Sequence, residues 1–169
     1  MVDLLADRRL YAYDESEASP SLDELRARYA RQAVGRSPDG RETWHSWILR
    51  ERVSGLAVGF VQATVGPTAG TSSADVDTAA TPYDGATSAE LAWVVGVEWQ
   101  GRGYATEAAA AVRDAVRAAE HGTGDHVTHV HAHIAPGNVA SETVARHLGL
   151  VPTAVVHDGE VRWELRPAP

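Results

Sequence analysis

The chain has 169 residues, of which 44% are hydrophobic and 22% charged, and its net charge is −8. This composition is ordinary for a soluble globular protein, and the length suits a single domain over residues 1–169. The negative charge argues against a nucleic-acid partner, and the absence of cysteine excludes disulfides, thiolate metal sites and a cysteine nucleophile. No segment approaches the roughly 20 apolar residues that span a bilayer, and no signal peptide is visible, so we expect a cytoplasmic protein without a membrane partner.

The first part of the chain predicts one helix and one β-hairpin. Apolar residues recur at helical spacing over residues 22–34, and Ser21 with Glu24 has the spacing of a capping box. Residues 44–51 and 56–65 are rich in aromatic and β-branched side chains and lie on either side of a Ser-Gly pair. This pattern indicates two strands joined by a turn.

The middle of the chain predicts a loop, a strand and a long helix. Residues 66–88 are crowded with Gly, Pro, Ser, Thr and Asp, which is typical of a long, flexible, functional loop. Residues 90–97 form the third predicted strand. A glycine turn at 101–103 leads into an alanine-rich amphipathic helix over residues 104–120. The glycine-containing segment 121–124 ends this helix.

The last part predicts a strand, a short helix and a second hairpin. The strand covers residues 127–134, and the helix has Asn138 as its N-cap and Gly149 at its C-terminal end. The hairpin joins residues 153–157 to residues 160–165 across an Asp-Gly pair. The order of elements predicts an α/β (α+β) domain whose mixed, mostly antiparallel sheet is flanked by helices.

The glycine turn at 101–103 is a candidate phosphate site, because a helix N-terminus offers free backbone N–H groups and a dipole that favours anions. An ordinary strand–helix turn is the alternative. The dinucleotide fingerprint does not fit, since Thr106 stands where Gly or Ala is needed. A P-loop does not fit either, because the chain contains no lysine.

Two motifs around this turn resemble those of the GNAT superfamily, the GCN5-related N-acetyltransferases. Gln100-Gly101-Arg102-Gly103-Tyr104-Ala105 is similar to the acyl-CoA signature Gln/Arg-x-x-Gly-x-Gly/Ala. Asn138-Val139-Ala140-Ser141, with Gly149 eleven residues after the Asn, resembles the second CoA-side motif of the family. The Asn-x-x-Ser pattern is most similar to the branch that includes the ribosomal-protein alanine acetyltransferases.

The resemblance covers residues 44–165 and implies a GNAT-like fold with acetyl-CoA as cosubstrate. The N-terminal strand of the family is expected to be missing, because residues 1–10 are too short for it and its helix. The third strand would pair with pantetheine like an added strand, and the glycine turn would hold the pyrophosphate. The cofactor-binding residues that the resemblance implies are Trp93, Val94, Val95, Gln100, Gly101, Arg102, Gly103, Tyr104, Ala105, Thr106, Asn138 and Ser141.

The implied reaction is direct attack of a primary amine on acetyl-CoA. An alkylamine must lose a proton before it attacks, and Glu90 stands where related enzymes carry a base; a solvated strand-end carboxylate is the alternative. Many family members have a Tyr acid seven residues after the Asn, but here this residue is Ala145. The acid role therefore passes to Ser141, another residue or water. A non-catalytic acyl-CoA-binding regulatory domain of the same fold is the alternative function.

Three histidines, His129, His131 and His133, share one face of the fourth predicted strand. Ordinary packing, a two-histidine metal site, and a role of His131 or His133 as base or substrate contact are the alternatives. No third ligand stands out in the sequence, so we expect no metal and place His133 among the catalytic residues. The acceptor stays open between a small-molecule amine, such as an aminoglycoside, and a protein N-terminus. A missing first strand leaves a sheet edge exposed, which predicts a homodimer or cover by residues 1–20.

Overall fold

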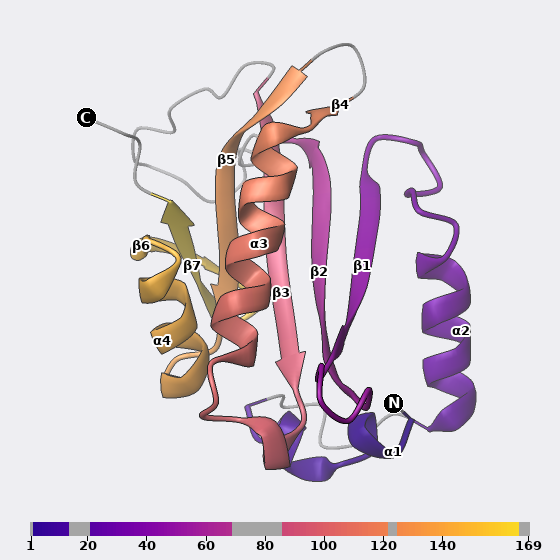
Figure 1. The fold of residues 1–169 in the computed structure, drawn as a ribbon. Coiled ribbons are helices and arrows are strands. Elements are labelled where there is room, and N and C mark those ends of the chain that lie inside the picture. The colour runs from indigo at the N-terminus through magenta and orange to yellow at the C-terminus, as the bar shows by residue number, and fades with distance from the viewer. Residues whose placement is uncertain (1, 14–20, 69–85, 122–124, 166–169) are drawn as a thin grey trace.

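The computed structural model describes residues 2–13, 21–68, 86–121 and 125–165, which form a mixed sheet with helices on both faces (Figure 1). The helical elements are α1 Val2–Leu5, η1 Arg8–Tyr11, α2 Leu22–Gln32, η2 Val97–Trp99, α3 Tyr104–Ala118 and α4 Val139–His147. The strands are β1 Thr43–Arg50, β2 Ala57–Pro67, β3 Thr87–Val95, β4 Glu120–His121, β5 Asp125–Ile134, β6 Leu150–His157 and β7 Glu160–Leu165.

Six strands follow the order β1-β2-β3-β5-β7-β6, and the short β4 pairs with β5. The pairing of β3 with β5 is parallel, whereas the other pairs are antiparallel. The predicted mixed, mostly antiparallel sheet is thus confirmed. In the described part of the chain the first strand is β1, which lies at one edge of the sheet and follows α1, η1 and α2.

Local signals place the helix ends where the sequence predicts them. Ser21 and Glu24 form the capping box of α2. The side chain of Asn138 accepts a hydrogen bond from the Ser141 N–H at 3.1 Å and so begins α4. Gly149 follows α4 with a φ of 81°, the left-handed conformation that glycine adopts easily.

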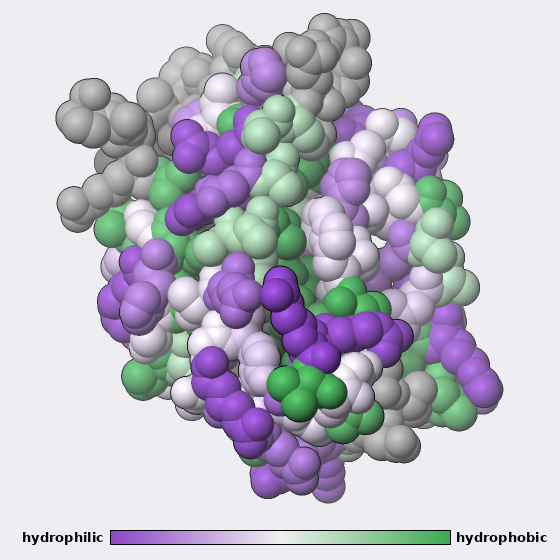
Figure 2. Space-filling model, in the orientation of Figure 1, coloured by the Kyte–Doolittle hydropathy of each residue, from purple (hydrophilic) through white to green (hydrophobic). Residues whose placement is uncertain are grey.

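The two faces of the sheet bury different side chains. On one face, α3 and α4 cover a large apolar core that includes Leu91, Val130 and Trp163. Figure 2 shows this side, where mildly hydrophobic residues lie along α3 between hydrophilic ones. On the other face, Leu25 of α2 packs with Phe60 of β2 in a smaller cluster. Alternation along β3 therefore directs Leu91 toward α3 and Glu90 toward the side of α2.

Several predicted boundaries were wrong, because strand pairing rather than composition decides where a strand ends. The predicted loop 66–88 is shorter at both ends, since β2 continues to Pro67 and β3 begins at Thr87; residues 69–85 lie outside the described part. The predicted third strand, 90–97, ends at Val95. The predicted helix 104–120 ends earlier, at Ala118, and Glu120–His121 form the strand β4, which pairs with the start of β5. Likewise, β5 and β6 each begin before residues 127 and 153, because β4 and β7 pair with those additional residues.

None of the helices among the described residues is sufficiently long and apolar to span a membrane.

Candidate active site

The glycine turn lies between η2 and α3, at the end of β3, and it leaves the N-terminus of α3 open. Gly101 and Gly103 have φ values of 72° and 86°, and a Cβ at either position would meet no atom within 4 Å. Gly103 is the N-cap of α3. No side chain caps the first N–H groups of α3, and an uncapped helix N-terminus is the arrangement that binds phosphate oxygens.

Side chains on both sides of this turn hold it in place. The amide nitrogen of Gln100 donates to the carbonyl oxygen of Val95 at 3.0 Å and so ties the turn to the end of β3. The hydroxyl of Tyr104 donates to Oε1 of Glu51 at 2.7 Å, and Arg102 lies 4.0 Å from the same oxygen. Glu51 belongs to the β1–β2 connection and also accepts a hydrogen bond from Ser54, and these bonds lower the pKa of its carboxyl group.

The two central strands pair only over part of their length. The pairing of β3 with β5 runs from Thr87 with Val127 to Glu90 with His131, although β3 continues to Val95. On its opposite edge, β5 pairs with β7 from His131 to Ile134. The backbone of β3 after Glu90 is thus not paired with β5, and this stretch leads directly to the glycine turn.

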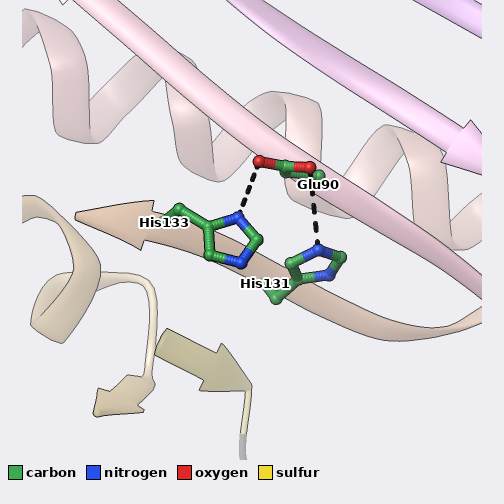
Figure 3. Close-up of side chains that lie close together, drawn as sticks. All are labelled: Glu90, His131 and His133. Carbon is green, nitrogen blue, oxygen red and sulfur yellow. Dashed lines mark hydrogen bonds and ion pairs between the residues drawn. The ribbon is translucent and has the colours of Figure 1, made fainter. Parts of the chain in front are cut away.

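Glu90 and two histidines meet where this pairing ends. Nδ1 of His133 lies 2.9 Å from Oε1 of Glu90, and Nε2 of His131 lies 3.9 Å from Oε2 (Figure 3). The histidine side chains are only 8% and 15% exposed, for His131 and His133 respectively, whereas that of Glu90 is 44% exposed. Glu90 and His133 are 43 residues apart in the sequence, and the parallel pairing of their strands brings them together.

The electrostatics of the cluster assign the protons. The hydrogen bond with His133 and the nearby histidine and arginine charges hold the pKa of Glu90 below its usual range, despite partial burial. An ionised Glu90 can only accept a hydrogen bond, so Nδ1 of His133 must donate, and Nε2 carries the lone pair when the ring is neutral. Burial and the charge of Arg162 lower the pKa of His131 to about 4, so His131 is neutral at pH 7.

The same three side chains also have the composition of a metal site. One ligand atom each from Glu90, His131 and His133 lies within 4.8 Å of the other two. Two imidazoles and a carboxylate can hold zinc or a similar ion with a position left open. The sequence does not show that Glu90 is the third candidate ligand, because Glu90 belongs to a different strand from the histidines.

Comparisons with known proteins add the family to this geometry. The sequence profile described as "Acetyltransferase (GNAT) domain" matches residues 1–151. The chain belongs to the GNAT acetyltransferase family. No curated protein sequence matches the chain.

Solved structures support the GNAT fold. The acetyltransferase from Agrobacterium tumefaciens superposes with a TM-score of 0.65 at 17% identity, over 98% of this chain and 82% of that chain. The aminoglycoside acetyltransferase AAC(6')-Ib in complex with coenzyme A gives 0.66 at 15% identity, over 96% and 84%. Its complex with ribostamycin and coenzyme A gives 0.67 at 16% identity, over 96% and 83%. At these identities the likeness concerns the fold alone.

The second motif of this GNAT chain lies on the opposite side of the sheet from Glu90. Asn138 and Ser141 are in the first turn of α4, which packs beside α3, and Ser141 is half-buried. Ala145, at the position where many relatives carry a tyrosine, is fully buried in the core. Ser141 therefore does not contact the Glu90–His133 pair.

Sequence reasoning missed two residues that the GNAT fold brings to this site. Glu51 contacts the glycine turn across 53 residues of sequence, and Arg162 of β7 is the strand partner of His133. No local pattern marks either residue, because each acts through pairing of distant segments.

Proposed function

We propose that this GNAT protein transfers an acetyl group from acetyl-CoA to a primary amine by direct attack. The observation that carries the proposal is the 2.9 Å contact between Glu90 and His133 at the end of the β3–β5 pairing. From this point, the part of β3 not paired with β5 leads to the open glycine turn. A proton acceptor and an anion site thus lie at the two ends of one short strand segment.

In this proposal the cosubstrate follows that segment. The N–H groups of residues 101–106 bind the pyrophosphate, with Arg102 at the rim. The backbone of Trp93, Val94 and Val95 pairs with pantetheine like an added strand, and one N–H of β3 polarises the thioester carbonyl. Gln100 keeps the turn joined to β3, and Asn138 keeps the first turn of α4 formed beside it. Acetyl-CoA acts as a cosubstrate, and no metal takes part.

The proton path differs in one respect from the expectation drawn from the sequence. The sequence predicts Glu90 as the base, but the lowered pKa of Glu90 makes it a weak proton acceptor. In this proposal Nε2 of His133, which carries a free lone pair when Nδ1 donates to Glu90, takes the proton, and Glu90 orients the ring. The amine nitrogen attacks the thioester carbon, its proton passes to His133, and the carbon–sulfur bond breaks to release the CoA thiolate.

The thiolate then takes up a proton, either from Ser141 on the α4 side of the sheet or from water. Ala145 cannot supply it, since its methyl group has no proton to give and is buried. The Asn-x-x-Ser pattern resembles that of the branch with the ribosomal-protein alanine acetyltransferases, so a protein N-terminus and a small-molecule amine are both candidate acceptors. A cytoplasmic location belongs to the same proposal, and the cysteine-free composition fits a reducing compartment.

A thiol-release assay with acetyl-CoA and a panel of amines tests the function. The panel should contain small alkylamines, ω-amino acids, an aminoglycoside and a peptide with an N-terminal alanine. Release of thiol together with an acetylated amine, detected by mass spectrometry, supports the proposal. Saturable acetyl-CoA binding without turnover on any amine would instead support a non-catalytic acyl-CoA-binding domain, the function that the missing tyrosine favours.

A further inference from the structure

A polar pocket lies between α2 and the sheet, on the face that carries Glu90. It has a volume of about 290 Å³, and its lining includes Arg28, Arg31 and Gln32 from α2. From the sheet, the lining includes Trp44, Gln62 and Thr64, and we call this cavity the α2 pocket. Leu25 and Phe60 pack together beside it and hold the helix against the sheet.

Strand register connects the α2 pocket to the Glu90–His133 pair. Trp44 pairs with Thr64, Thr64 pairs with Glu90, and Glu90 pairs with His131. Residues paired across neighbouring strands lie on the same face, about 4.8 Å apart for each strand. The pocket therefore begins one strand away from Glu90 and reaches roughly 10 Å from it at the outer strand, β1.

The charge of the α2 pocket is opposite to that of the protein. Arg28 and Arg31 are one helical turn apart and exposed at the rim, and neither side chain forms a hydrogen bond or ion pair within the described part of the chain. No carboxylate is among the described residues that line the pocket. In a chain with a net charge of −8, two arginines that have no acidic partner among the described residues form a local site for an anion.

A buried polar atom in the same pocket also lacks a partner. The side-chain oxygen of Gln32 is inaccessible to solvent and accepts no hydrogen bond from the described residues. An unsatisfied buried acceptor is costly, and a ligand N–H or O–H would satisfy it. A carboxylate has no proton to donate, so the Gln32 oxygen would pair with an N–H or O–H between the two ends of the ligand, and the two arginines with its anion.

We propose that the acceptor of this enzyme is a small molecule with a primary amine at one end and a carboxylate or phosphate roughly 10 Å away, bound by Arg28 and Arg31. This inference rests on the proposed function, because the amine end is placed at the Glu90–His133 pair. It distinguishes the acceptor from a polycation such as an aminoglycoside, whose charges the two arginines would repel.

Three acceptors of matched length test the proposal: 8-aminooctanoate, octylamine and 1,8-diaminooctane, which end in an anion, a methyl group and a cation. We expect kcat/KM to be highest for 8-aminooctanoate, by about tenfold over octylamine, as two exposed ion pairs allow. The double variant Arg28→Gln/Arg31→Gln should lower kcat/KM for 8-aminooctanoate by about tenfold and so remove its preference over octylamine. The control is Arg26→Gln, on the same helix but paired with Asp23 at 3.2 Å and outside the pocket.

Equilibrium binding of 8-aminooctanoate, measured by calorimetry without acetyl-CoA, separates this inference from the proposed function. Weaker binding to the double variant than to Arg26→Gln supports the pocket even if no amine is acetylated. Equal kcat/KM for the three acceptors, a preference for the diamine, or equal binding to both variants would overturn it. A preference for a peptide N-terminus that survives the double substitution would also overturn it.

Discussion

Replacement of Glu90 by glutamine tests the proposed proton path most directly. The substitution keeps the size and shape of the side chain and removes its charge. A glutamine carbonyl can still accept the hydrogen bond from Nδ1 of His133, which is 2.9 Å from the carboxylate in the native protein. The variant therefore isolates the electrostatic contribution of Glu90 to the protonated imidazole that forms when the amine attacks.

The structure sets the magnitude of this contribution. Two unit charges about 4 Å apart interact by about 4 kcal/mol at an effective dielectric constant of 20. Because the Glu90 side chain is 44% exposed, solvent screening reduces this to about 2–3 kcal/mol. At 1.36 kcal/mol per tenfold change, kcat should fall roughly 30- to 150-fold. The affinity for acetyl-CoA should stay nearly the same, since backbone groups further along the chain hold it.

Steady-state kinetics with the best acceptor, together with direct titration of acetyl-CoA, measure both effects. The loss of kcat should shrink as pH rises, because more of the amine is then already neutral. Glu160→Gln, near the β6–β7 turn, makes the same chemical change outside the cluster and should retain full activity. An unchanged kcat in Glu90→Gln, or a loss of acetyl-CoA binding equal to the loss of kcat, would refute the reasoning.

Four further predictions follow from other parts of the molecule. Acetyl-CoA at 100 times its Kd should add about 2.7 kcal/mol to the free energy of unfolding, seen as a rise in Tm that NADH does not produce. Gly103→Val should remove this shift. Gly40→Val should retain it, because Gly40 has a similar φ and equally open surroundings but lies outside the turn. The pKa of His131 is lowered to about 4, so below about pH 6.5 this residue binds fewer protons in the folded state than in the unfolded chain. The free energy of unfolding should therefore decrease by about 2–3 kcal/mol between pH 7 and pH 4.5 because of His131. Urea titrations of His131→Asn should show a smaller decrease. EDTA should leave turnover unchanged, and a loss that zinc restores would show that the carboxylate–histidine cluster holds a required metal. If β1 pairs with a second copy, light scattering should give a dimer mass that Ile48→Glu, at an exposed apolar position on this strand, reduces to that of a monomer; a native monomer would contradict the predicted dimer.

Short-range signals in the sequence determined the elements and the two motifs. The capping box at Ser21 and the cap at Asn138 depend only on side chains within a few residues, so the sequence predicts both helix starts correctly. The glycine turn is equally local, because Gly101 and Gly103 adopt positive φ values that other residues rarely adopt. Alternation along β3 was sufficient to place Glu90 and Leu91 on opposite faces.

Only the tertiary structure decided what these elements form together. The 2.9 Å contact of Glu90 with His133 requires β5 to lie beside β3 and parallel to it, a choice of partner that no local pattern encodes. The contact of Glu51 with Tyr104 and the pocket between α2 and the sheet also join segments that are far apart in the sequence. Spacing along the chain reports backbone conformation over a few residues, whereas a catalytic pair or a charged pocket depends on which distant surfaces pack together to bury the core.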